Sequence, residues 1–191
     1  MIRDLGRRGR LELGVGGRLC MSGLTRAAAD HMPQLRCLAY ELIYGDDFQY
    51  ALHRSPHLEG LKVILRECEF DVLAFIHDHS PHLKSLSIEG RWEVKLPSFI
   101  QLVQLPDLKH LCIGSYYEVQ PTGGPDLAKL ADAGLETLDF SDVINADIQP
   151  FMAMAKKWSM LRRLILAPFA TDGDLEIICA SCPRLEELHT V

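Results

Sequence analysis

Three histidines stand close together at His77, His79 and His82, in the segment His-Asp-His-Ser-Pro-His. Imidazoles at short spacing are common ligands of transition metals. Two residues that are two positions apart do not share one face of a helix, however, so His77 and His79 diverge. His82 stands directly before a leucine, as His57 does 25 residues earlier, which makes it part of a repeated pattern. We therefore expect no metal site.

A second candidate is the Cys-x-x-Cys spacing of Cys179 and Cys182. A redox-active pair of this kind follows a strand and opens a helix. Here the spacing of apolar residues predicts that the pair closes a helix, and we expect buried, unreactive thiols. The chain has six cysteines and no secretory signal precedes them. We therefore expect reduced thiols and an intracellular compartment, cytoplasm or nucleus.

The residue types needed for catalysis are not arranged for it. Gly14-Val-Gly16-Gly17 lacks the Lys-Ser/Thr that follows a phosphate-binding loop. The best polar candidates, His110, Asp139 and Arg163, fall on three different predicted strands. We expect no enzymatic activity and no cofactor.

Charge and hydropathy exclude two further classes. Lys plus Arg total 20 and Asp plus Glu total 26, giving a net charge of −6, opposite to the usual bias of nucleic-acid binders. No run of 18 apolar residues is present, so we expect no membrane span. Residues 1–30 alone carry six arginines against three acids, and a mitochondrial presequence remains the alternative to a cytoplasmic or nuclear location.

One pattern organises the whole chain: Leu, two residues, Leu, one residue, then an apolar residue. Its first leucine recurs at 35, 58, 83, 108, 135, 161 and 185, in steps of 23 to 27 residues. The Leu-x-x-Leu-x-apolar segment alternates like a short strand. Upstream pairs such as Phe48/Ala51 and Leu73/Ile76 have helical spacing. Equivalent pairs fall at Phe151/Met154 and Leu175/Ile178. The pairs Phe99/Leu102 and Leu127/Leu130 sit closer to their leucines, which predicts shorter or shifted helices.

Proline stands two residues before the first leucine in most copies and predicts a bend that ends each helix. A single helix and strand cannot bury their apolar faces, so the copies must stack. The predicted fold is an α/β solenoid of seven to eight repeats of about 25 residues. Its parallel sheet lies on the concave face and its helices on the convex face.

The predicted domain covers residues 8–191, and residues 1–7 form an N-terminal arm or truncated cap. An eighth copy begins the domain if Arg8 replaces the first leucine and Leu11 and Leu13 hold the next two strand positions. Neither end shows a polar cap, which leaves a fragment of a longer chain, a wrong start codon and partner-covered ends as alternatives.

These repeats resemble leucine-rich repeat proteins, and most closely the cysteine-containing subtype found in F-box proteins, including fungal F-box-like proteins. The resemblance rests on Leu161-x-x-Leu164-x-Leu166, on Thr171-Asp172, and on Cys182-Pro183-x-Leu185. Ser55 and Ser80 replace the subtype's cysteine in two copies, and no F-box is visible in residues 1–30. The resemblance implies the substrate-recognition part of an SCF-type ubiquitin ligase, joined to its Skp-type adaptor and cullin through a missing F-box.

Between the buried leucines, strand side chains face the inner surface in columns. We predict partner binding on that face, and also by two adjacent tyrosines on a Gly/Pro-rich loop, Tyr116 and Tyr117. The candidate residues on the strands are Lys62, Ser85, Ser87, Glu89, His110, Thr137, Asp139, Arg163, Ile165 and Glu187.

The columns mix signs of charge, which favours a protein partner over a phosphate backbone. The predicted function is therefore a protein–protein interaction module, whose partners would be ubiquitin-ligase substrates if the resemblance holds. A free-standing adaptor or assembly factor, and less readily a GTPase activator built on the repeat, are the alternatives.

Overall fold

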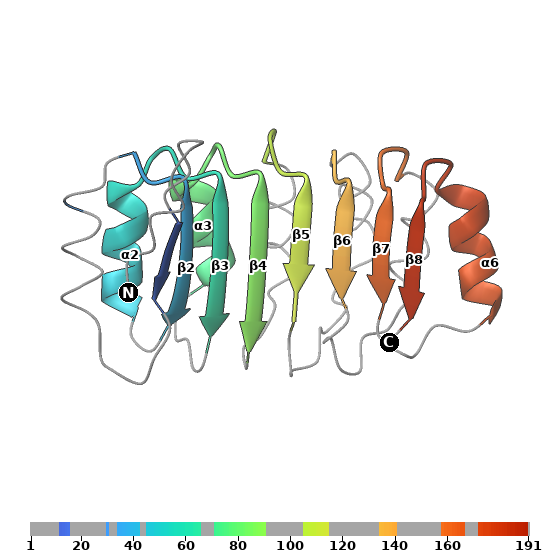
Figure 1. Ribbon diagram of the computed structural model, residues 1–191, viewed down its shortest axis with the longest axis horizontal. Helices are drawn as coiled ribbons and strands as arrows, with labels where there is room; N and C mark the ends of the chain where they lie inside the picture. The colour runs from blue at the N-terminus through green and yellow to red at the C-terminus, as the bar shows by residue number, and fades with distance from the viewer. Residues whose placement is uncertain are drawn as a thin grey trace.

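Eight strands form one parallel sheet in which spatial order follows chain order (Figure 1). The computed structural model describes residues 12–15, 30, 34–42, 45–65, 71–90, 105–114, 134–140, 158–166 and 172–190. The strands are β1 (Glu12–Val15), β2 (Cys37–Leu42), β3 (Gly60–Leu65), β4 (Ser85–Gly90), β5 (His110–Ile113), β6 (Thr137–Phe140), β7 (Arg163–Leu166) and β8 (Glu187–Thr190).

Three helices are described, each directly before a strand of the sheet: α2 (Gly45–Arg54), α3 (Val72–His79) and α6 (Asp172–Ser181). In Figure 1 α3 lies behind the sheet, so the opposite face of the strands, which we call the open face, is turned toward the viewer. Phe48 of α2 and Phe75 of α3 pack with ring centroids 6.4 Å apart. The other predicted helices, around 99–102, 127–130 and 151–154, lie outside the described residues.

Two rows of stacked leucines run through the whole core, which also includes the third apolar strand position and apolar residues of the helices. In six successive repeats the first and the second leucine are each no more than 3% exposed. The first row is Leu35, Leu58, Leu83, Leu108, Leu135 and Leu161, and the second is Leu38, Leu61, Leu86, Leu111, Leu138 and Leu164. In the last repeat Leu185 and Leu188 are only partly buried. Alternation in the strands therefore sends every second side chain into the core, as predicted.

A tight turn links each helix region to its strand. In one repeat the Leu58 N–H donates to the Ser55 carbonyl oxygen at 3.2 Å, and four other described repeats repeat this bond. Proline holds the second position of that turn at 56, 81, 106 and 183, where its fixed φ is favoured. The predicted bend is confirmed, and it sets where each strand begins.

In six repeats the residue between the first leucine and the strand has a carbonyl that accepts two backbone hydrogen bonds. The Glu59 carbonyl accepts from the N–H groups of Lys84 and Ser85, at 2.7 and 3.0 Å. The carbonyls of Arg36, Lys84, Lys109, Glu136 and Arg162 each accept the corresponding pair from the next repeat. These bonds hold every repeat at the same height relative to its neighbour.

The first strand pairs in a register that differs from the predicted one by two residues. Leu13, not Leu11, lies opposite Leu38, so residue 10 rather than Arg8 corresponds to Leu35. A shift of two preserves the alternation of faces, which is why the sequence did not decide between the two registers. The observed register gives a first step of 25 residues, the average period of the chain.

Gly90 ends β4 in a conformation that only glycine adopts readily. Its φ is 118°, and an added Cβ would meet the Leu65 carbonyl oxygen at 1.9 Å. The sheet therefore requires glycine at this strand end.

Leu86→Asp tests the buried row. The variant places a charge without a partner among packed leucines, and we expect it to lose more than about 4 kcal/mol of stability or to fail to fold. Ser85→Asp is the matched control, because it adds the same charge one residue away on the exposed face. Urea denaturation followed by circular dichroism measures both, and a cooperatively folded Leu86→Asp variant would contradict the assigned core.

The first residue of the tight turn is buried in all five described turns, whatever its type. Ser55 and Ser80 are 0% exposed, and Cys182 holds the same place in the last repeat. Neither serine Oγ has a hydrogen-bond partner. A buried hydroxyl without a partner costs about 1–3 kcal/mol, so serine is a poorer choice here than cysteine or alanine.

Ser80→Ala should therefore raise the free energy of unfolding by about 1 kcal/mol, because it removes the unsatisfied hydroxyl. Ser85→Ala, on the exposed face of the following strand, should change it by less than about 0.5 kcal/mol. Thermal or urea unfolding of the two variants gives the answer. A clear loss of stability in Ser80→Ala would show that the hydroxyl forms a bond.

Candidate functional site

The open face of the sheet carries the predicted binding residues in straight columns. Strand pairing places Gly60, Ser85, His110, Thr137, Arg163 and Glu187 opposite one another along the sheet. A second column contains Lys62, Ser87, Cys112, Asp139, Ile165 and His189. None of the ten predicted strand residues is buried, so all remain accessible to a partner. The columns form as the sequence spacing predicts.

On β3 and β4 the candidate residues contact one another. Lys62 Nζ donates to Glu89 Oε1 at 2.7 Å, and Ser87 Oγ donates to the same oxygen at 3.3 Å. Ile64 adds an exposed apolar side chain on the same face of β3. This part of the face thus combines a neutralised ion pair with an apolar contact.

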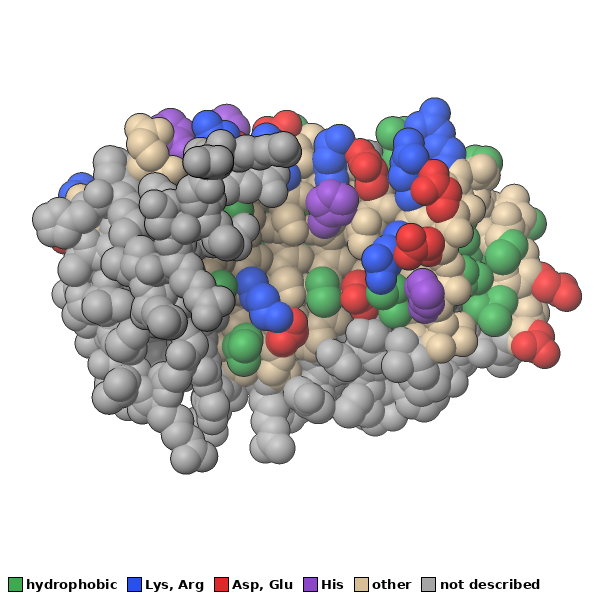
Figure 2. Space-filling model, in the orientation of Figure 1, with side chains coloured by type: hydrophobic (Ala, Val, Ile, Leu, Met, Phe, Trp, Pro, Cys, Tyr) green, Lys and Arg blue, Asp and Glu red, His purple; other side chains and the backbone are tan. Residues whose placement is uncertain are grey.

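On β5 to β8 the face is more polar. His110 Nδ1 lies 3.1 Å from Thr137 Oγ1 on the neighbouring strand. Arg163 Nε lies 3.3 Å from Glu187 Oε2, and His189 Nε2 lies 3.6 Å from the same oxygen. Figure 2 shows both signs of charge scattered over this face instead of one uniform field. Such a mixed surface suits a protein with complementary charges.

The three histidines considered as metal ligands each make a different contact. His77 contacts Asp78, His79 lies 2.9 Å from the Phe75 carbonyl oxygen, and His82 lies 3.7 Å from Asp107. Among the residues that the structure describes, no three metal-ligating side chains gather at one point. The predicted loop tyrosines, Tyr116 and Tyr117, lie outside the described residues.

The two cysteines of the pair differ in burial: Cys182 is buried, but Cys179 is exposed on the last turns of α6, so the expectation of two buried thiols is wrong for Cys179. Desolvation raises the pKa of the Cys182 thiol to about 11, and the nearby Cys179 adds to the effect. A thiol with so high a pKa is almost wholly protonated near neutral pH and is a poor nucleophile. The pair closes α6, with Cys182 directly after the helix, as predicted.

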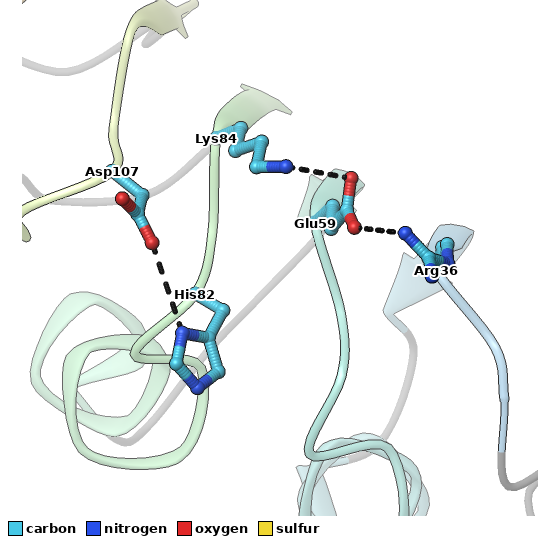
Figure 3. A network of polar contacts seen from close by, with 5 residues as sticks. All are labelled: Arg36, Glu59, His82, Lys84 and Asp107. Atoms are coloured by element: carbon cyan, nitrogen blue, oxygen red, sulfur yellow. Dashed lines mark hydrogen bonds and ion pairs between the residues drawn. The ribbon is translucent and has the colours of Figure 1, made fainter.

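A row of charged residues at one edge of the sheet was not predicted. We call it the rim ladder; it comprises the residue after the first leucine of each repeat: Arg36, Glu59, Lys84, Lys109, Glu136, Arg162 and Glu186. Arg36 and Lys84 both pair with Glu59, Lys84 at 3.1 Å (Figure 3). Further along, Lys109 pairs with Glu136 at 2.7 Å.

The last pair of the ladder joins Arg162 to Glu186 at 2.8 Å. Figure 2 shows both signs of charge along this upper edge of the sheet. Exposed pairs of this kind contribute little stability each, and together they leave the rim nearly neutral.

The ladder lowers the pKa of Glu59 and of Glu136. The hydrogen bond from Lys84 is the main cause for Glu59, and the positive charges of Lys84 and Arg36 add to it. The hydrogen bond from Lys109 has the same effect on Glu136, which also feels the charges of His110 and Arg162. Both carboxylates are therefore charged throughout the neutral pH range.

Positive and negative residues alternate along the rim ladder except between Lys84 and Lys109, two neighbouring members that we call the lysine step. Lys84 and Lys109 are neighbours in the ladder and carry the same charge, while each bonds to a glutamate on its far side. His82 and Asp107, which lie two residues before them, form a contact of their own across the same two repeats (Figure 3). The sequence contains this signal, but only an alignment of all repeats at the first leucine makes it visible.

The structure offers no membrane-crossing helix within its described segments, since none is long and apolar enough. No protein-family model and no curated protein matches the sequence.

A solved structure shows a similar fold: an internalin, a leucine-rich repeat protein, from Listeria monocytogenes. The two superpose with a TM-score of 0.54 at 16% sequence identity, over 98% of this chain. The chain corresponds to 55% of the internalin chain, so it spans little more than half of that length. With the parallel sheet and the helices on its other side, this likeness shows that the fold is a leucine-rich repeat solenoid.

Proposed function

We propose that this chain is a protein-interaction module that binds its partner on the open face of the sheet. The observation that carries the proposal is the face itself: aligned columns of accessible polar, charged and apolar side chains. At about 4.8 Å between strands, eight strands span roughly 34 Å, which accommodates an interface of standard size.

Charge and chemistry support a protein over other partners. The ion pairs Lys62–Glu89 and Arg163–Glu187 bring opposite charges together on the face. A nucleic-acid backbone selects for a continuous basic track, which this arrangement does not provide. Exposed Ile64 and partly exposed Ile165 supply apolar contacts within the polar surround, as protein interfaces do.

A finer proposal makes the chain the substrate-recognition part of an F-box-type ubiquitin ligase. Its support is the resemblance at the last repeat, where Cys182 holds the position of the subtype's cysteine and is buried. A free-standing adaptor without a ubiquitin link uses the same face and the same residues. The proteins that co-purify with the full-length protein from cells distinguish the ligase proposal from the adaptor proposal.

The double variant Lys62→Glu with Arg163→Glu should weaken partner binding about tenfold or more while the protein stays folded. Both side chains are exposed, and each takes part in a surface ion pair whose loss costs less than about 1 kcal/mol. Affinity purification from cells followed by quantitative mass spectrometry compares the proteins recovered with each form. Proteins lost with the variant are the partners of this face.

Arg54→Glu is the matched control, because it reverses one exposed arginine on α2, away from the open face. Recovery should match the unmodified protein. If the double variant also recovers every partner at full yield, the open face is not the binding surface and the loop of Tyr116 and Tyr117 becomes the next candidate. Recovery of a cullin with its adaptor supports the ligase proposal, and their absence favours a free adaptor.

A further inference from the structure

The step between Lys84 and Lys109 is the single place in the rim ladder where like charges are neighbours. Backbone bonds fix this neighbourhood, because the Lys84 carbonyl accepts from the N–H groups of Lys109 and His110 at 2.9 and 3.1 Å. The two lysines therefore stand directly before the adjacent strands β4 and β5, and their ammonium groups turn in opposite directions, each toward its own glutamate. Their side chains are 50% and 53% exposed, so a partner has free access to both.

Neither lysine is saturated by the bond it makes. An ammonium group has three donors, and each lysine uses one of them on the glutamate at its far side. Donors therefore remain for an acceptor that a partner brings to this step. Asp107 lies two residues before Lys109, and its carboxylate turns toward His82 (Figure 3).

The surroundings restrict which anion fits. Glu59 and Glu136 stand on either side of the lysine pair, one repeat away, and Asp107 lies beside it. A polyphosphate chain extends past one repeat and meets these carboxylates, which repel it. A single carboxylate occupies only one step of the ladder, and its negative charge restores the alternation of signs along the rim.

We propose that the Lys84–Lys109 step binds an aspartate or glutamate side chain of the protein partner that occupies the open face. The proposal rests on the proposed function, since it names the chemistry of part of that partner. The partner's acid then takes the place of the acidic residue that the ladder lacks, and it fixes the partner's position along the sheet.

The test uses the full, isotope-labelled chain and a short acetylated and amidated peptide, Gly-Ser-Glu-Glu-Ser-Gly, titrated in an NMR experiment at low salt. Shifts should concentrate at the amide and ammonium groups of Lys84 and Lys109 and at His110. The peptide with Gln in place of Glu should give shifts about fivefold smaller, because its charges are gone.

The most specific control moves the pair of neighbouring like charges to another place in the rim ladder without changing the net charge. In the double variant Lys109→Glu with Glu136→Lys, signs alternate from residue 36 to residue 136, and like charges meet at residues 136 and 162 instead. Peptide shifts should leave Lys84 and His110 and gather around Arg162 and Arg163. If this variant does not fold, Lys84→Gln with Lys109→Gln should abolish the localised shifts.

Three results would overturn the proposal: shifts spread evenly over all exposed basic residues, shifts that remain at Lys84 in the exchanged variant, or equal binding of inorganic phosphate or oligothymidylate at this step. Its failure is separate from that of the proposed function. If Lys62→Glu with Arg163→Glu still releases the partner, the open face binds protein and only the role of the lysine step is lost.

Discussion

Parallel pairing between adjacent repeats is the interaction on which the rest of the structure depends. One carbonyl per repeat accepts two N–H groups from the next repeat, and this bond starts each new strand at the same height. Once the height is fixed, the two leucine rows stack into a continuous core and the exposed residues fall into columns. The rim ladder has the same origin, since all its members except the last, Glu186, supply these carbonyls. Core, open face and charged rim are therefore three consequences of one repeated backbone bond.

Much of the fold could be predicted because the leucine spacing, the prolines and the alternation agree with one another. The position of every column residue from β2 to β8 follows from counting two and four residues past a first leucine. The first strand was the exception. Its leucines at 11 and 13 satisfy the alternation in either of two registers, and only the backbone pairing with β2 selected Leu13. Sequence patterns with a period of two cannot resolve a shift of two.

The sequence predicts the positions of the candidate site residues, but it does not predict the contacts between their side chains. Lys62 lies opposite Ser87 whereas Glu89 lies opposite Ile64, so the bond between Lys62 and Glu89 crosses from one column of the face to the next. That bond depends on the length and direction of a lysine side chain, which no spacing encodes. The rim ladder was readable, since Arg36, Glu59 and Lys84 each follow a first leucine. It lies outside the alternating pattern that predicts the candidate site, because these residues precede the strands.

The strictly sequential strand order has a consequence for how the chain is made. Every strand pairs only with the strands before and after it in the chain, about 25 residues away. A newly added repeat thus finds its docking surface already complete while later repeats are still being synthesised. Such a protein can fold during synthesis, and each helix and strand that leaves the ribosome adds one repeat to the part that is already folded. The same logic lets evolution add or delete whole repeats, and with them move a like-charge step along the rim, without designing a new core.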